Sequence, residues 1–225
     1  MSGTQVNRLA LFDCDGTLVD SQHNIATAME ACFADAGLPA PDRSATRRVV
    51  GLSLFEAMQS LLPDADEDRC EALAEGYKKS FQRLRAEGLV EEPLFDGIVE
   101  ALDVLEADGW LLGVATGKSD RGLRLALEGH GLAHRFVTCQ TADRHPSKPH
   151  PSMIEQAMAE AGASPATTVM IGDTRYDIAM AHNAGVRAIG VAWGYHEPHE
   201  LIEEGADAVA THPSELPALC AKESA

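Results

Sequence analysis

Two carboxylates, Asp13 and Asp15, follow an apolar run in the stretch LALFDCDGTLVDS, residues 9–21. Because side chains two residues apart on an extended chain point to the same side, both carboxylates should face one place. Like charges held so close disfavour each other's ionisation, so the pair requires either a bound cation or a shared chemical task. The plainer alternative is a turn before Gly16 in which the aspartates hydrogen-bond the local backbone.

Further polar side chains lie near the ends of apolar runs elsewhere in the chain. Thr116 ends LLGVAT, Asp173 ends TVMIGD, and Asp177 follows one helical turn later. Lys148 precedes another helical pattern in the stretch SKPHP. The carboxyl ends of the strands in an open α/β sheet form its ligand crevice, so these residues are candidates for one site. Taken singly, Thr116 could be a helix N-cap, Lys148 a solvated loop residue and Asp177 a residue that favours a helix N-terminus.

The elements that would position these residues alternate as in an α/β protein. Apolar runs predict strands at residues 9–13, 111–116, 168–173 and 187–193, with weaker candidates at 135–140 and 207–211, the last as an edge strand. Amphipathic stretches predict helices at residues 98–109, 119–131, 151–162 and 174–185, each ending at a glycine. The expected fold class is therefore α/β, with a Rossmann-like parallel sheet as its core.

Residues 21–92 interrupt this alternation, because they carry helical patterns and no convincing strand. Two stripes of apolar residues have helical spacing. Between them, Ser53 and Glu56 have the spacing of a capping box at the start of a further helix. We expect a small all-helical domain inserted after the first strand, so that residues 1–20 and 93–225 form a discontinuous core and residues 21–92 form a cap over the crevice.

Composition argues against several classes of protein. Lys and Arg total 18 against 35 Asp and Glu, for a net charge of −17, which disfavours binding to nucleic acid or to an anionic membrane surface. An anionic substrate would have to meet a local positive feature or a bound cation. The five cysteines form no CxxC pair, no apolar run is long enough to span a bilayer, and the N-terminus lacks the apolar region of a secretory signal. We therefore expect a soluble protein of the cytoplasm.

The stretch DCDGTLVDS, residues 13–21, resembles the first signature of the haloacid dehalogenase superfamily of phosphohydrolases, D-x-D-G-T-[LV]-x-D-[ST]. Thr116, Lys148 and the stretch GDTRYD, residues 172–177, are similar to the other three signatures and occur in the same order. The resemblance spans residues 9–177. It implies a Mg²⁺-dependent enzyme that hydrolyses a phosphate ester of a small metabolite.

The aspartates of these motifs have distinct expected roles. The carboxylate of Asp13 could attack phosphorus and form an aspartyl-phosphate, which splits the hydrolysis into two easier steps. Asp15 would protonate the leaving oxygen and later take a proton from the attacking water, and the resemblance implies that its main-chain carbonyl also holds the metal. Asp13 and Asp173 are the expected carboxylate ligands of Mg²⁺, with Asp177 as a further ligand or a residue behind them.

The remaining motif residues would handle the phosphate. Thr116, with Gly117 and Lys118 opening the next helix, could hydrogen-bond the phosphate oxygens through hydroxyl and main-chain N–H groups. Lys148 would supply the positive charge that the transition state and the crowded carboxylates both require. Cys14 alternates to the opposite face of the strand and is expected in the core.

Within the superfamily, Asp15 argues against the dehalogenases, whose halide leaving group needs no proton. The nearest resemblance is to phosphoglycolate phosphatases, through the stretches GVAWGY and GADAVATHPSEL. In the cap, RRVVGLSL resembles the loop that faces the substrate. Arg48 or Arg47 would meet a substrate carboxylate there or, as the alternative, lie at a solvated helix end.

Two other functions remain open. Mutases of the β-phosphoglucomutase type carry a histidine in the early cap helix, and His23 is close enough to that position to keep this hypothesis. A non-catalytic regulatory module that retains the metal site would be expected to lose Asp13, Asp15 or Lys148, all of which are present. The sequence indicates neither the oligomeric state nor which phosphate ester is the substrate.

Overall fold

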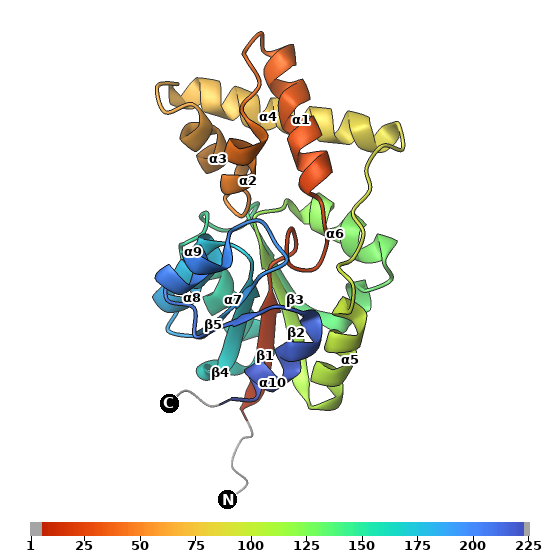
Figure 1. The fold of residues 1–225 in the computed structure, drawn as a ribbon, viewed down its shortest axis with the longest axis vertical. Coiled ribbons are helices and arrows are strands. Elements are labelled where there is room, and N and C mark those ends of the chain that lie inside the picture. Colours follow the sequence, from red (N-terminus) through yellow and green to blue (C-terminus); the bar gives the residue numbers. More distant parts are fainter. Residues whose placement is uncertain (1–5, 223–225) are drawn as a thin grey trace, which may run out of the picture.

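The computed structural model describes residues 6–222, and its core is a six-stranded sheet with helices on both faces (Figure 1). The strands are β1 (Asn7–Phe12), β2 (Trp110–Thr116), β3 (Phe136–Thr141), β4 (Ala163–Gly172), β5 (Arg187–Val191) and β6 (Ala208–Ala210). They lie in the order β3-β2-β1-β4-β5-β6, and all pairs are parallel. Every predicted strand is confirmed, including the edge position of β6.

The helices of the core form one layer on each face of this sheet (Figure 1). One layer holds α5 (Ile98–Ala107), α6 (Asp120–Gly129) and α10 (Leu216–Cys220), and the other holds α7 (Ser152–Ala161), α8 (Arg175–Asn183) and α9 (Pro198–Glu203). Because side chains alternate along a strand, Phe12 of β1 packs in one apolar cluster and Leu11 in the other. The predicted helices are confirmed as α5 to α8, whereas α9 and α10 are too short to show an apolar period. Short 3₁₀ turns at Ala133–Arg135 and Pro213–Glu215 precede β3 and α10.

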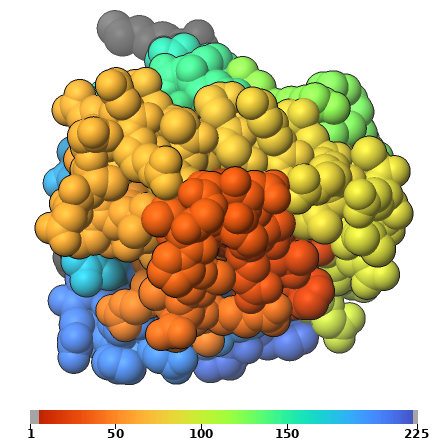
Figure 2. Space-filling model, turned by 90° about the horizontal axis from the view of Figure 1, so that it is seen from above, coloured from red at the N-terminus to blue at the C-terminus, as the bar shows by residue number. Residues whose placement is uncertain are grey.

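Four helices stand between β1 and α5 and lie above the carboxyl end of the sheet (Figure 1). They are α1 (Gln22–Asp35), α2 (Arg43–Arg48), α3 (Leu54–Leu61) and α4 (Glu67–Ala86). Of these, α1, α3 and α4 pack on an apolar cluster of their own, which includes Phe33, Met58 and Leu73. Seen from above, these segments cover most of that end of the molecule (Figure 2). We call this helical part the cap.

The two connections between the cap and the core run side by side. Asp20 N donates a hydrogen bond to Pro93 O at 2.8 Å, and Val19 pairs with Leu94 in an isolated antiparallel bridge. A helical unit with its own apolar cluster and paired connections has the features of an inserted domain. These features support the boundaries that we propose from the sequence, with residues 21–92 as the cap.

The start of α3 differs from the sequence prediction. Ser53 is the N-cap residue, but its side chain accepts no hydrogen bond from the helix, and no capping box with Glu56 forms. In a capping box the side chain at the third helical position accepts from the N-cap N–H. Here the N–H of Ser53 donates to Ser147 Oγ of the core at 2.8 Å instead. The backbone N–H of Ser53, which a capping box would use, therefore makes a contact between cap and core.

The five cysteines are all free thiols in the structure, and four of them are buried. Cys14 belongs to the apolar cluster under α5, as its place in the strand predicts. Burial raises the pKa of the Cys14 thiol well above its usual value, so packing rather than reactivity describes its role. None of the described helices combines the length and the apolar character that crossing a membrane would require.

Candidate active site

Asp13 directly follows β1 at the carboxyl end of the sheet and is almost fully buried, at 1% exposed. Its Oδ1 accepts a hydrogen bond from Cys14 N at 2.6 Å, and Lys148 Nζ lies 2.9 Å from its Oδ2. No donor in good hydrogen-bonding geometry reaches Oδ2 among the residues that the structure describes. This oxygen is therefore available to bind a cation or to attack an electrophile.

Lys148 lies between two carboxylates with its side chain fully buried. Its Nζ is 2.9 Å from Asp13 Oδ2 and 2.6 Å from Asp177 Oδ1. Burial opposes the charge on this amine, but the carboxylates of Asp13 and Asp177 outweigh it and raise the pKa of Lys148 above its usual value. Lys148 is thus a fixed cation beside Asp13, and the alternative of a solvated loop lysine is wrong.

Asp173 follows β4 and is fully buried. Its Oδ1 accepts from Thr17 Oγ1 at 2.9 Å, and its Oδ2 accepts from Tyr195 N at 2.9 Å. One carboxylate oxygen each of Asp13, Asp173 and Asp177 lies within 4.8 Å of the other two. The tertiary structure therefore gathers three of the predicted acidic residues in one place.

Asp177 combines the two roles that its sequence position allows. Its Oδ2 accepts from Thr174 N at 3.0 Å and from Thr174 Oγ1 at 2.7 Å, in a capping box at the start of α8. Its Oδ1 accepts from Lys148 Nζ at 2.6 Å. The helix cap thus fixes a carboxylate that in turn holds Lys148 beside Asp13.

The group formed by Asp13, Asp173, Asp177 and Lys148 has three carboxylates and one ammonium group. Burial raises the pKa of Asp13 to about 6 and that of Asp173 well above its usual value, and neighbouring carboxylates add to both shifts. A divalent cation among these oxygens would supply the missing positive charge and keep them ionised. An all-oxygen donor set suits Mg²⁺, so the residues present fit the metal that the resemblance implies.

Asp15 lies apart from that group. Its carboxylate accepts a hydrogen bond from Ser21 Oγ and forms an ion pair with Lys118, Oδ1 to Nζ 2.8 Å. Lys118 Nζ also lies 2.8 Å from Glu92 Oε1, and Arg85 Nη2 lies 2.6 Å from Glu92 Oε2. The Asp15 side chain is therefore occupied by Lys118, and a contribution of Asp15 to metal binding would come from its main-chain carbonyl, as the resemblance implies.

Glu92 is a site residue that sequence reasoning missed. It lies in the connection between cap and core, with its side chain 6% exposed, and joins Lys118 of the core to Arg85 of α4. Burial disfavours the charged carboxylate, but Lys118 and Arg85 outweigh it and lower the pKa of Glu92 below its usual value. No motif marks this residue, and only its place next to Pro93 at the cap boundary could have indicated it.

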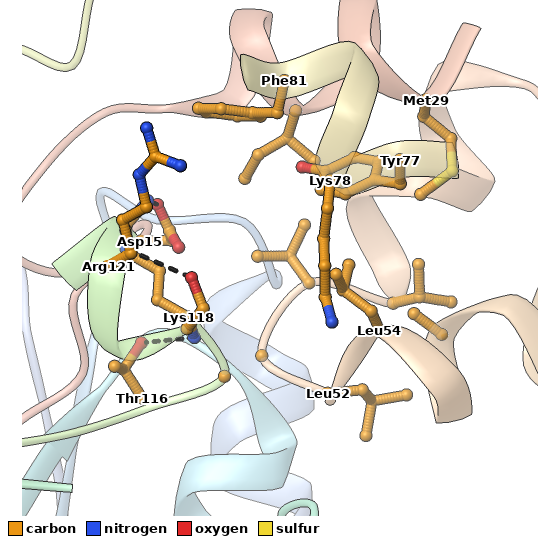
Figure 3. Close-up of a pocket in the computed structure, with 18 of the residues that line it drawn as sticks. Asp15, Met29, Leu52, Leu54, Tyr77, Lys78, Phe81, Thr116, Lys118 and Arg121 are labelled. Atoms are coloured by element: carbon orange, nitrogen blue, oxygen red, sulfur yellow. Dashed lines mark hydrogen bonds and ion pairs between the residues drawn. The ribbon is translucent and has the colours of Figure 1, made fainter. Parts of the chain in front are cut away.

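A cavity of about 430 Å³ lies between the cap and the core (Figure 3). From the core it is lined by five predicted site residues: Asp13, Asp15, Thr116, Gly117 and Lys118. Lys118 N donates a hydrogen bond to Thr116 Oγ1 at 3.3 Å (Figure 3). This bond joins the Thr116 hydroxyl to the backbone of the loop that follows β2. Lys148, Asp173 and Asp177 are not part of the lining and act on the cavity through Asp13.

Two glycines of the motifs are required by close approaches. Gly16 has φ +82°, and a Cβ there would lie 2.1 Å from Asp173 Oδ2. At Gly117 a Cβ would lie 2.7 Å from Leu52 O, which belongs to the cap. A side chain at Gly16 would displace Asp173, and one at Gly117 would push the cap away from the core.

The arginines predicted to face the substrate lie elsewhere. Arg48 Nη2 pairs with Glu200 Oε1 at 2.9 Å, and Arg47 Nη2 donates to Gly194 O at 3.1 Å. Both interactions join the end of α2 to the core, and neither arginine lines the main cavity. The substrate contact predicted for Arg48 therefore has no support from its position. The basic side chains that do line the cavity include Lys78, Arg85 and Arg121.

Comparison with known proteins agrees with these motifs. Residues 10–191 match the sequence profile of haloacid dehalogenase-like hydrolases. A probable phosphatase of Dickeya dadantii, IndB, is 40% identical over 86% of this chain and 84% of its own length.

Two further relatives have more specific names. An N-acetylmuramic acid 6-phosphate phosphatase of Pseudomonas putida is 34% identical over 93% of this chain and 94% of its own. A phosphoglycolate phosphatase of Agrobacterium fabrum is 32% identical over 87% of this chain and 84% of its own. The solved structure of a predicted phosphatase from Clostridium acetobutylicum has a TM-score of 0.85 and 27% identity, with 96% of this chain and 98% of that chain covered. The chain therefore belongs to the haloacid dehalogenase-like hydrolases, in the group that resembles phosphoglycolate phosphatases.

Proposed function

We propose that this protein is a Mg²⁺-dependent phosphatase that hydrolyses a small phosphorylated metabolite through an aspartyl-phosphate on Asp13. The observation that carries the proposal is the state of Asp13 Oδ2, a buried carboxylate oxygen beside Lys148 that has no hydrogen-bond donor in good geometry. Asp13 also lines a cavity large enough for an organic phosphate. The phosphatase names of the relatives support the same reaction.

In the first step, Asp13 Oδ2 attacks phosphorus, and the bond from phosphorus to the alcohol oxygen breaks. Asp15, which must enter this step protonated, gives its proton to that leaving oxygen, while Thr116 hydrogen-bonds a phosphate oxygen. Lys148 offsets the negative charge of the reacting groups. Mg²⁺, when bound by Asp13 and Asp173, would shield the carboxylate from the anionic phosphate.

In the second step, water attacks the aspartyl-phosphate and releases inorganic phosphate. Asp15, now ionised, takes the proton of that water. Lys118 Nζ lies 2.8 Å from Asp15 Oδ1 and holds this carboxylate in place while it acts as the base. Cap segments cover the end of the molecule that holds the site (Figure 2), and this limits the access of bulk water to the reacting groups.

The structure offers less support for the mutase alternative. His23 is exposed near the start of α1, where it lines a separate cavity of about 230 Å³ with Arg43 and Arg47. A histidine there does not border the cavity that holds Asp13 and Asp15. The binding-module alternative is weakened by the complete set of charged residues around Asp13. A cytoplasmic location is part of the proposal, since free thiols such as Cys139 suit a reducing compartment.

The test is hydrolysis of p-nitrophenyl phosphate with and without Mg²⁺, by the wild type and by Asp13→Asn. We expect Mg²⁺-dependent turnover, reduced at least about a thousandfold in Asp13→Asn, because the nucleophile is lost. Asp68→Asn is the matched control, because Asp68 is exposed in the first turn of α4. A wild type without metal-dependent turnover, or turnover that survives Asp13→Asn, would show that the proposal is wrong.

A further inference from the structure

The cap contributes many apolar side chains to the cavity that Asp13 lines, together with polar ones such as Lys78 and Arg85. The apolar lining residues from the cap include Met29 of α1, Leu54 of α3 and Tyr77 and Phe81 of α4 (Figure 3). A phosphate held at Asp13 would place the organic part of its ester against these side chains. The cap side chains would therefore contact the alcohol part of the ester and select among substrates by that part.

Two aromatic rings belong to this apolar surface. Tyr77 and Phe81 stand one helical turn apart on α4, with ring centroids 5.9 Å apart and planes inclined by 43°. Tyr77 is buried, whereas Phe81 is only half-buried. Because side chains four residues apart share one helix face, both rings belong to the face that α4 turns to the cavity.

Two charged neighbours from the boundary between cap and core lie over the Phe81 ring. The Arg85 guanidinium lies 5.7 Å and Lys118 Nζ 5.9 Å from the ring centroid. Both cations are themselves fixed by the Glu92 carboxylate. Phe81 is thus a positioned ring next to the residue that holds Asp15, and its half-buried side chain lines the cavity, where it can pack against a substrate.

The size of the cavity excludes a close fit to a very small ester. Its volume of about 430 Å³ falls in the range of about 300–1,000 Å³ typical of pockets for drug-sized ligands. A phosphorylated two-carbon acid is much smaller than such ligands and would leave the surfaces of Tyr77 and Phe81 in contact with water. A ring with an apolar face would reach them and release that water.

Resting on the proposed phosphatase function, we propose that the preferred substrate is a phosphate monoester of a ring compound of hexose size or larger, with an apolar face that packs against Phe81. Phe81 is then a specificity-determining residue. A phosphorylated two-carbon acid still reaches Asp13 and reacts, but it forfeits the contact with the cap.

The experiment compares kcat/KM for phosphoglycolate, glucose 6-phosphate and N-acetylglucosamine 6-phosphate, with Mg²⁺ present. The wild type should favour at least one of the two ring esters over phosphoglycolate by about tenfold or more, the scale of a lost apolar contact in a pocket. In Phe81→Ala this ratio should fall by about tenfold. Phe81→Leu, which keeps apolar volume without a ring, should lower it by less and guards against a cap that no longer folds.

Phe55→Ala is the matched control, because Phe55 packs against the same apolar cluster of the cap but does not line the cavity. It should retain the wild-type ratio. An active enzyme that prefers phosphoglycolate, or whose ratio is the same in Phe81→Ala and Phe81→Leu as in the wild type, overturns this inference alone. An enzyme that hydrolyses none of these esters and no p-nitrophenyl phosphate overturns the proposed function as well.

Discussion

On its core side the cavity borders fixed charges. On its cap side it borders mainly apolar side chains such as Met29 and Phe81, together with Lys78 and Arg85 of α4. Asp13 and Asp177 share Lys148, and Asp15 shares Lys118 with Glu92. The cap side depends on packing within an apolar cluster and makes few directed contacts to the cavity. The comparison indicates that the reaction depends on the exact positions of charged atoms on the core side. The choice of substrate depends on the shape of the cap side.

The physical reason is that misplacing a buried charged group costs more free energy than misplacing an apolar one. A buried charge without its partner is strongly unfavourable, and Lys148 and Lys118 each pair with two carboxylates. Apolar side chains of similar volume replace one another at modest cost. Substitutions on the core side should therefore have large effects on every substrate, and those in the cap should alter the choice among substrates.

The largest effect that we expect is that of Lys148→Met. It leaves Asp13 and Asp177 buried without their ammonium partner, which should lower the free energy of unfolding by about 3–5 kcal/mol. Turnover should fall at least about a hundredfold, because the fixed cation beside the nucleophile is lost. Urea unfolding and steady-state kinetics measure the two quantities. The control is Lys79→Met, at an exposed position of α4, and wild-type stability of Lys148→Met would contradict the comparison.

Metal binding should stabilise the core side next most strongly. Mg²⁺ at a hundred times its dissociation constant should raise the free energy of unfolding of the wild type by about 2.7 kcal/mol. Asp173→Asn should lose most of this increase, because Asp173 is one of the three clustered carboxylates. Thermal unfolding with and without Mg²⁺ is the measurement, with the exposed Asp96→Asn as control. An equal Mg²⁺ effect in wild type and Asp173→Asn would place the metal elsewhere.

A smaller effect is expected at the boundary of the two regions. Glu92→Gln removes the charge that holds Lys118 and Arg85 together, so Lys118 should position Asp15 less well. We expect kcat to fall by about tenfold with KM changed little, as for a residue that aids proton transfer indirectly. The adjacent Glu91→Gln is the control, since Glu91 is exposed. A change in KM alone would assign Glu92 to substrate binding instead.

The smallest effect is expected for Arg48→Ala. Arg48 is 63% exposed and pairs with Glu200 across cap and core, and exposed ion pairs contribute about 0–1 kcal/mol. KM and kcat should each change by less than about threefold. Arg43→Ala, which breaks the Arg43–Glu30 pair within the cap, is the matched control. A tenfold rise in KM for Arg48→Ala alone would restore the substrate contact predicted from the sequence.

The motifs made much of the core side predictable. Asp13, Thr116 and Asp173 stand at or just after strand ends in the sequence, and the carboxyl ends of parallel strands meet at one edge of a sheet. The role of Glu92 was not predictable, because a residue in a connecting segment has no periodicity that fixes its direction. For Arg48, the sequence predicts a helix end or a substrate contact, and only the packing of α2 against the core selects its partner.

The sequence by itself determined where the six strands and the helices α5 to α8 lie along the chain. It also determined which acidic residues follow β1 and β4. These depend on local alternation and spacing, which the chain specifies over a few residues. Only the tertiary structure decided that Lys148 pairs with Asp13 and Asp177, that Lys118 pairs with Asp15, and that aromatic rings of α4 face the cavity. Each of these contacts joins segments far apart in the chain, so it exists only once sheet and cap have packed together.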